Sequence, residues 1–79
     1  MLYLITFHTH YGAMSFNQFC RKRDLESKMQ PVPRSLSSSC GICVILNTDT
    51  LPSLVEHEDY EACYQVMDNE QYLLLDEQP

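Results

Sequence analysis

The opening segment, Leu2 to His8, constrains the fold most, because a strand here would be apolar on both of its faces. Alternate side chains of a strand point to opposite sides of a sheet. One face would carry Leu2 and Leu4, and the other face would carry Tyr3, Ile5 and Phe7. Such a strand belongs in the interior of a sheet, with a neighbour on each side. The segment also lacks the basic start and the small-residue cleavage site of a secretion signal.

From Thr9 the apolar pattern takes on a helical period, which predicts a helix that is capped by Thr9 and runs to about Arg23. A second helix is predicted from Thr50 to about Glu58, with a proline near its first position. Four more segments have the length and composition of strands: Leu25 to Val32, Ile42 to Leu46, Tyr60 to Met67 and Gln71 to Leu75. The serine-rich stretch Arg34 to Gly41 is predicted to be a loop.

This order predicts an α+β protein with a single domain over residues 1–79. Right-handed crossovers would fold it into a ferredoxin-like βαββαβ sandwich with an added C-terminal strand. In that topology the first strand lies between the third and the fourth and is antiparallel to the third. The end of the first strand, the start of the first helix and the start of the third strand should therefore meet at one end of the sheet.

The charge is divided unevenly along the chain. Residues 1–48 carry +3 and residues 49–79 carry −9, which gives the net charge of −6. Clustered cations are needed to bind phosphates, so we expect no nucleic-acid partner. The longest apolar runs are far shorter than the roughly 20 residues of a membrane helix, so we expect no membrane partner and a cytoplasmic location. Four cysteines without an extracellular context are expected to be free thiols.

Cys40 is the candidate for chemistry. A thiol reacts as its thiolate, which helix N-termini, unpaired loop amides and nearby cations favour. Cys40 is expected beside the start of the first helix, in a loop of Ser37, Ser38, Ser39 and Gly41, with Arg34 a few residues away. The alternative is a buried structural cysteine in a serine-rich turn.

Two further patterns involve the same end of the sheet. Cys43 has the spacing of a second thiol, but an extended backbone would place it too far from Cys40 for an easy disulfide. His8 and His10 would point the same way from a strand, and with the two cysteines they make an alternative two-histidine, two-cysteine zinc set. The preferred prediction is that there is no metal and no cofactor. His57 is expected to be solvated, and Cys20 and Cys63 are expected to lie in the core.

The segments Tyr3 to Phe7 and Val32 to Gly41, together with Ala13, make this chain similar to a bacterial family of small domains described as selenium/sulfur carrier-like. The resemblance is firm through residue 46 and looser over Asp59 to Tyr64. It implies that Cys40 is the functional cysteine and that Arg34 and the three serines form its loop. The chain departs from the family pattern in its short second helix, in Cys43, and in its continuation past the fourth strand.

We therefore expect a sulfur or selenium carrier, or a thiol-handling protein, in which Cys40 holds a persulfide or selenosulfide. A carrier or accessory protein is favoured over a stand-alone enzyme because no catalytic base is evident. Its partner would be a donor or acceptor enzyme, and a homodimer is compatible with the sequence. The alternatives are a small zinc-binding protein that uses His8, His10, Cys40 and Cys43, and an interaction module without chemistry.

Overall fold

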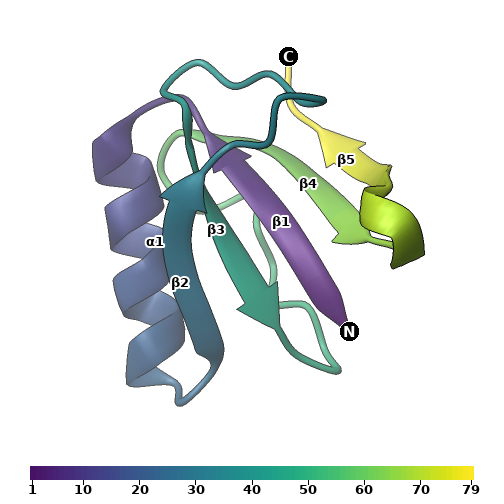
Figure 1. Cartoon of the computed structure of the whole chain (residues 1–79). Coiled ribbons are helices and arrows are strands. Elements are labelled where there is room, and N and C mark those ends of the chain that lie inside the picture. Colours follow the sequence, from purple (N-terminus) through teal and green to yellow (C-terminus); the bar gives the residue numbers. More distant parts are fainter.

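Five strands form one antiparallel sheet, and the first strand lies at its centre (Figure 1). The computed structural model describes all residues, 1–79. The strands are β1 (Leu2–Phe7), β2 (Glu26–Pro31), β3 (Ile42–Asn47), β4 (Tyr60–Val66) and β5 (Tyr72–Glu77). Their order across the sheet is β2-β3-β1-β4-β5. The predicted position of β1, between β3 and β4 and antiparallel to β3, is confirmed.

The core explains why β1 is apolar on both sides. Leu4, Ile5 and Phe7 have no exposed surface. Ile5 and Phe7 belong to the cluster that packs beneath the helix, whereas Leu4 faces the opposite side of the sheet. Burying a large aliphatic side chain contributes about 1.5–3 kcal/mol, so these residues hold the centre of the sheet in place.

The helix α1 (His10–Lys22) covers one face of the sheet (Figure 1). The Thr9 side chain accepts a hydrogen bond from the Gly12 backbone N–H, which confirms the predicted cap. Ala13, Phe16 and Cys20 are buried along one stripe that faces the sheet. The helix is too short and too polar to cross a membrane.

The predicted second helix does not form, and its residues belong to the loop between β3 and β4. Three carboxylates, from Glu56, Glu58 and Asp59, would crowd the negative end of a helix dipole, and no cation is nearby in the chain to offset them. A hydrogen bond of 3.0 Å from the His57 N–H to the Leu54 carbonyl closes a turn instead. Leu54 is buried within this turn. The ferredoxin-like sandwich is therefore incomplete, and the fold is an α+β sheet with one helix.

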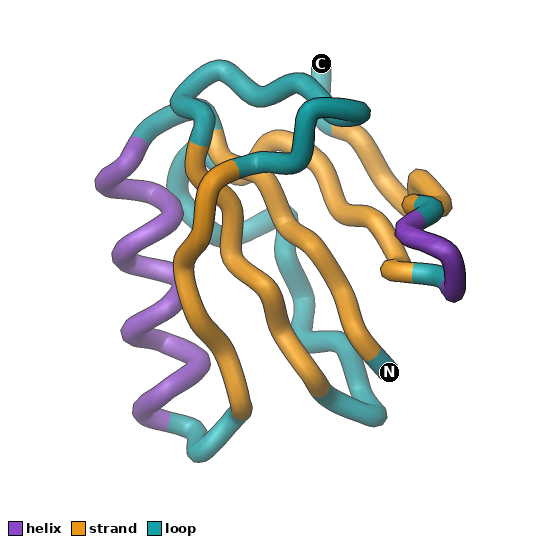
Figure 2. The backbone as a smooth tube through the Cα atoms, in the orientation of Figure 1, coloured by secondary structure: helices purple, strands orange, loops and turns teal.

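Two connections shape the remaining surface. A short 3₁₀ turn, η1 (Asp68–Glu70), joins β4 to the added strand β5, and both Asn69 and Glu70 have positive φ angles there. The long loop of residues 32–41 passes over the end of the sheet at which β1 stops and β3 and β4 begin (Figure 2). This loop carries Cys40 to the place that the topology predicts.

Candidate functional site

The loop that carries Cys40 is closed at its base by the backbone. The Val32 N–H donates to the Gly41 carbonyl over 3.0 Å, which joins the two ends of the loop. Gly41 has a φ of 76°, a conformation that side chains rarely adopt, so the turn directly after Cys40 requires glycine. A second turn, in which the Leu36 N–H donates to the Pro33 carbonyl over 3.0 Å, shapes the outer part of the loop.

Serine side chains fasten the loop to the sheet. The Ser38 hydroxyl donates to the carbonyl of Phe7, the last residue of β1, over 3.3 Å. The Ser39 hydroxyl donates to Glu61 Oε2 over 2.9 Å, and it lies 3.2 Å from His8 Nδ1. Because a hydroxyl has one proton and Glu61 receives it, His8 Nδ1 is the donor in the second contact. The same nitrogen lies 3.4 Å from Glu61 Oε2.

The start of α1 adds another attachment, directly at Cys40. His10 Nε2 lies 3.1 Å from the Cys40 carbonyl, so this nitrogen carries a hydrogen and donates it. Thr9 donates to Asp59 Oδ2 over 2.7 Å, and the His8 N–H donates to the Asp59 carbonyl over 2.8 Å. The predicted meeting of β1, α1 and β3 at one end of the sheet is confirmed by these contacts.

Cys40 itself is half-buried, and its thiol donates to the Ile42 carbonyl over 3.4 Å. The Gly12 and Ala13 N–H groups of α1 both donate to Thr9, so these two amides are not available to the Cys40 sulfur. The sulfur must therefore leave the Ile42 carbonyl when it reacts. Cys40 lies beside the start of α1, as predicted, and the contact between them is made by the His10 side chain.

The other three cysteines are shielded from solvent. Cys20, Cys43 and Cys63 have no exposed surface. Burial is the main cause that raises the pKa of the Cys20 and Cys43 thiols to about 11 and of the Cys63 thiol to about 12. Near neutral pH these thiols are protonated and inaccessible, which makes them poor nucleophiles. The core positions predicted for Cys20 and Cys63 are confirmed.

Cys43 is the second residue of β3 and points away from the helix, on the face that also carries Leu4. Its sulfur lies 3.9 Å from the Pro31 carbonyl, and it is not bonded to Cys40. No three histidine, cysteine, aspartate or glutamate side chains gather into a metal-binding group. His8 faces Ser39 and Glu61, and His10 faces a backbone carbonyl, so the zinc set proposed from the sequence is not assembled.

Arg34 and Ser37 are exposed, and neither side chain forms a hydrogen bond or an ion pair within the chain. The predicted loop therefore contains two kinds of residue. Ser38, Ser39 and Gly41 fix its shape, whereas Arg34 and Ser37 face solvent.

Sequence reasoning missed Asp59 and Glu61, which hold the ends of β1 and of the Cys40 loop. A signal was available, because the fourth strand was predicted to lie beside the first. His57 was predicted to be solvated, and this is wrong. Its ring packs edge-on against Phe16 and Phe19, with centroid distances of 4.8 and 4.5 Å.

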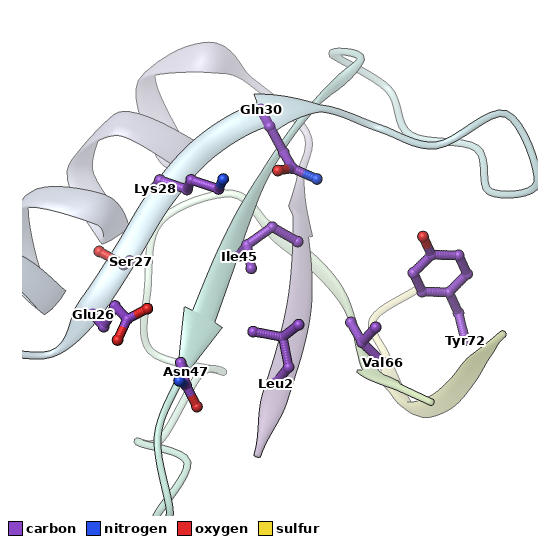
Figure 3. A pocket seen from close by; sticks show the side chains of 9 residues that line it. All are labelled: Leu2, Glu26, Ser27, Lys28, Gln30, Ile45, Asn47, Val66 and Tyr72. Atoms are coloured by element: carbon purple, nitrogen blue, oxygen red, sulfur yellow. The ribbon is translucent and has the colours of Figure 1, made fainter. Parts of the chain in front are cut away.

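The largest hollow of the surface lies elsewhere. It measures about 430 Å³ and occupies the helix-free face of the sheet (Figure 3). Leu2, Ile45, Val66 and Tyr72 form its apolar part, and Lys28 and Gln30 of β2 border it. Cys40 does not line it. The thiol therefore lies at the molecular surface, outside a substrate-sized cavity.

Comparison with known proteins yields one match. A sequence model of the family described as "Putative Se/S carrier protein-like" matches residues 2–73, which includes the Cys40 loop and the four strands β1 to β4. No curated protein and no solved structure matches the chain. Because the match spans most of the chain, this protein belongs to the Se/S carrier protein-like family.

Proposed function

We propose that the protein carries a sulfur or selenium atom on Cys40, as a persulfide or a selenosulfide, between a donor and an acceptor. The observation that carries the proposal is the contrast among the four cysteines. Cys40 is the one thiol that solvent reaches, and it sits on a loop attached through Ser38, Ser39 and His10. Membership of a family described by the same activity supports the proposal.

The loading step is a thiol exchange. The Cys40 thiolate attacks the terminal sulfur of a donor persulfide, R–S–SH, and a new S–S bond forms as the donor's S–S bond breaks. The donor leaves as the thiolate R–S⁻, and Cys40 becomes the persulfide Cys40–S–SH. Release is the same reaction with an acceptor thiolate as the attacking group. Selenium in R–S–SeH follows the same path, and neither step needs an oxidant or a reductant.

The surface position of Cys40 suits transfer between proteins. An enzyme that converts a small substrate encloses most of it in a cavity, whereas a carrier must present its cargo to two different active sites. The charge of −9 over residues 49–79 would attract a basic partner and raise the rate of encounter. We infer that the donor and the acceptor are enzymes with basic surfaces around their own reactive groups.

The test is to load the purified protein from a low-molecular-weight persulfide and to measure its intact mass. The wild type should gain one sulfur atom and lose it again when excess acceptor thiol is added. Cys40→Ser should gain none, because a serine hydroxyl cannot exchange sulfur. The substitution should change the free energy of unfolding by at most about 1 kcal/mol, because the side chain contributes little to the core.

Cys43→Ala is the matched control, since it removes a thiol three residues away that solvent does not reach. This variant should load like the wild type. If Cys40→Ser folds normally and still gains sulfur, Cys40 is not the carrier site. If it unfolds, as circular dichroism would show, the cysteine is structural and the proposal fails.

A further inference from the structure

The Cys40 thiol has to lose its hydrogen before it reacts. In the structure it donates this hydrogen to the Ile42 carbonyl over 3.4 Å. A carbonyl oxygen favours the protonated thiol, because a bond to the neutral form disfavours the charged one. The Gly12 and Ala13 amides of α1 donate to Thr9 and cannot stabilise a thiolate. A neighbouring side chain that takes the proton would therefore make Cys40 reactive near neutral pH.

Two histidines flank Cys40, one at the end of β1 and one at the start of α1. His8 Nδ1 lies 3.2 Å from the hydroxyl of Ser39, the residue directly before Cys40. His10 Nε2 lies 3.1 Å from the Cys40 carbonyl. Histidine is the side chain that ordinarily changes its charge nearest neutral pH, which makes it the most frequent proton acceptor in enzymes. Each of the two rings is thus a candidate base.

Glu61 distinguishes the two rings. Its Oε2 lies 3.4 Å from His8 Nδ1 and accepts from the Ser39 hydroxyl over 2.9 Å. The Glu61 side chain is 19% exposed and that of His8 is 43% exposed. Nδ1 of His8 is held by the protein, so Nε2 of the neutral ring has a free lone pair. A carboxylate behind a histidine also stabilises the imidazolium that forms when the ring takes a proton. His10 has only a carbonyl as its partner.

We propose that His8 is the general base for Cys40 and that Glu61 is a positioning residue that acts through His8. This proposal rests on the carrier function proposed above and adds a proton transfer to it. The sulfur leaves the Ile42 carbonyl, its hydrogen passes to His8 Nε2, and the thiolate attacks the terminal sulfur of the donor R–S–SH. The donor leaves as R–S⁻ and takes the proton back from the imidazolium as R–SH. The sum is the exchange of one sulfur atom between two thiols, without an oxidant or a reductant.

The charged groups around His8 are few. Glu61 is the one carboxylate within ion-pair distance of the ring. The neighbouring acid, Asp59, accepts from Thr9 through its carboxylate and from the His8 backbone N–H through its carbonyl. On α1 the His10 ring contacts a carbonyl of the loop, and the one charged side chain of the loop forms no ion pair. The pH dependence of the transfer therefore belongs to the His8–Glu61 pair and to the thiol itself.

The first experiment measures this proton transfer without the carrier chemistry. The rate constant for alkylation of Cys40 by iodoacetamide is followed by peptide mapping from about pH 5.5 to about pH 10, a range that includes the ordinary ionisation of histidine and cysteine. Near neutral pH His8→Gln should react at least about tenfold more slowly than the wild type, because the proton acceptor is lost. Above about pH 9.5 the two rates should converge, since an ordinary cysteine ionises there without a base. A residue that only supports the loop would not give this convergence.

The role of Glu61 is tested in the same assay. Glu61→Gln removes the charge at constant length and should slow alkylation near neutral pH, but less than His8→Gln does. The double variant should react no more slowly than His8→Gln alone, because Glu61 acts through the ring. Glu56→Gln removes the same charge from an exposed loop residue and should leave the rate unchanged. His10→Gln can still donate to the Cys40 carbonyl and should slow the reaction less than His8→Gln does.

The second experiment loads the same variants from a persulfide, after circular dichroism has shown that they are folded. If alkylation follows the predicted pH profile but Cys40 gains no sulfur, the carrier function fails and the base assignment remains. If Cys40 gains sulfur but His8→Gln alkylates as fast as the wild type near neutral pH, the base assignment fails and the carrier function remains. Two further results would overturn the proposal: a His8→Gln rate that stays low at every pH, or a larger loss in His10→Gln than in His8→Gln.

Discussion

Replacing Gly12 with alanine tests how α1 is seated at the site. Gly12 lies in the first turn of the helix, and a Cβ atom there would come within 2.7 Å of the Glu58 carbonyl oxygen and 2.9 Å of the Asp59 Cβ. Contacts this short require something to move. The obstacle cannot retreat easily, because Asp59 is held by Thr9 at 2.7 Å and by the His8 N–H at 2.8 Å.

Two effects of opposite sign set the magnitude. Alanine is favoured over glycine inside a helix by about 1 kcal/mol. Forcing an extra methyl group into a packed site costs about 1–3 kcal/mol, and the upper half of that range applies when the obstructing atom is backbone. We therefore expect Gly12→Ala to lower the free energy of unfolding by about 1–2 kcal/mol. Helix propensity alone would predict the opposite, an increase.

Urea denaturation followed by circular dichroism measures this difference. Gly41→Ala is the comparison, because no atom lies within 4 Å of the position that its Cβ would take, yet its φ of 76° disfavours alanine. Its loss, about 1 kcal/mol, would come from backbone strain in the Cys40 loop alone. If Gly12→Ala is as stable as the wild type or more stable, the tight seating of α1 against residues 58–59 is refuted.

Two further predictions concern thiol reactivity and pH. In the folded protein iodoacetamide should alkylate Cys40 well before Cys20, Cys43 or Cys63. These three thiols are buried, and their pKa values are raised to about 11–12. Equal labelling of all four cysteines in peptide maps would count against Cys40 as the reactive thiol. Burial lowers the pKa of His57 below its ordinary value of 6.5. As the pH falls, the imidazole is therefore protonated in the unfolded chain before it is protonated in the folded protein. The free energy of unfolding should consequently fall as the pH drops below about 6.5. His57→Phe should reduce that dependence in denaturation curves measured from about pH 7.5 to about pH 5.5, roughly one unit on either side of 6.5. An unchanged slope would rule out His57 as its source.

The sequence predicted the parts of the fold that local pattern controls. The Thr9 cap, the buried stripe through Phe16 and the doubly apolar β1 each follow from the spacing of side chains along one element. The position of β1 between β3 and β4 then followed from the predicted topology, and it brought Cys40 to the end of β1 as expected. These results depend on short-range pattern and on topology, both of which a single sequence contains.

The parts that were wrong depend on contacts between distant segments. His57 was expected in solvent because its chain neighbours are acidic, but Phe16 and Phe19 of α1 provide an aromatic surface for its ring. The predicted second helix is an exception, because its failure has a local cause: Glu56, Glu58 and Asp59 would crowd the negative end of the helix dipole. The His8, His10, Cys40 and Cys43 set failed because sequence places residues near one another without fixing where each side chain points.

The sequence nominated the centre of the candidate site but not the residues that hold it in place. Cys40 and its loop were identified from composition and resemblance, whereas Glu61 and Asp59 emerged from the pairing of β4 with β1. Ser39 shows the difference clearly. Its position in a serine-rich loop was evident, but its bond to Glu61 joins residues that are 22 positions apart in the sequence.

Locating the transferred sulfur distinguishes Cys40 from the other three thiols as the residue that carries it. Wild-type protein is loaded from a persulfide donor, trapped by alkylation while it is folded, and digested for peptide mass mapping. The added sulfur should be found on the peptide that contains Cys40, and acceptor thiol should remove it. Sulfur found instead on Cys20, Cys43 or Cys63, or no added sulfur on a folded protein, would show that Cys40 is not the carrier residue.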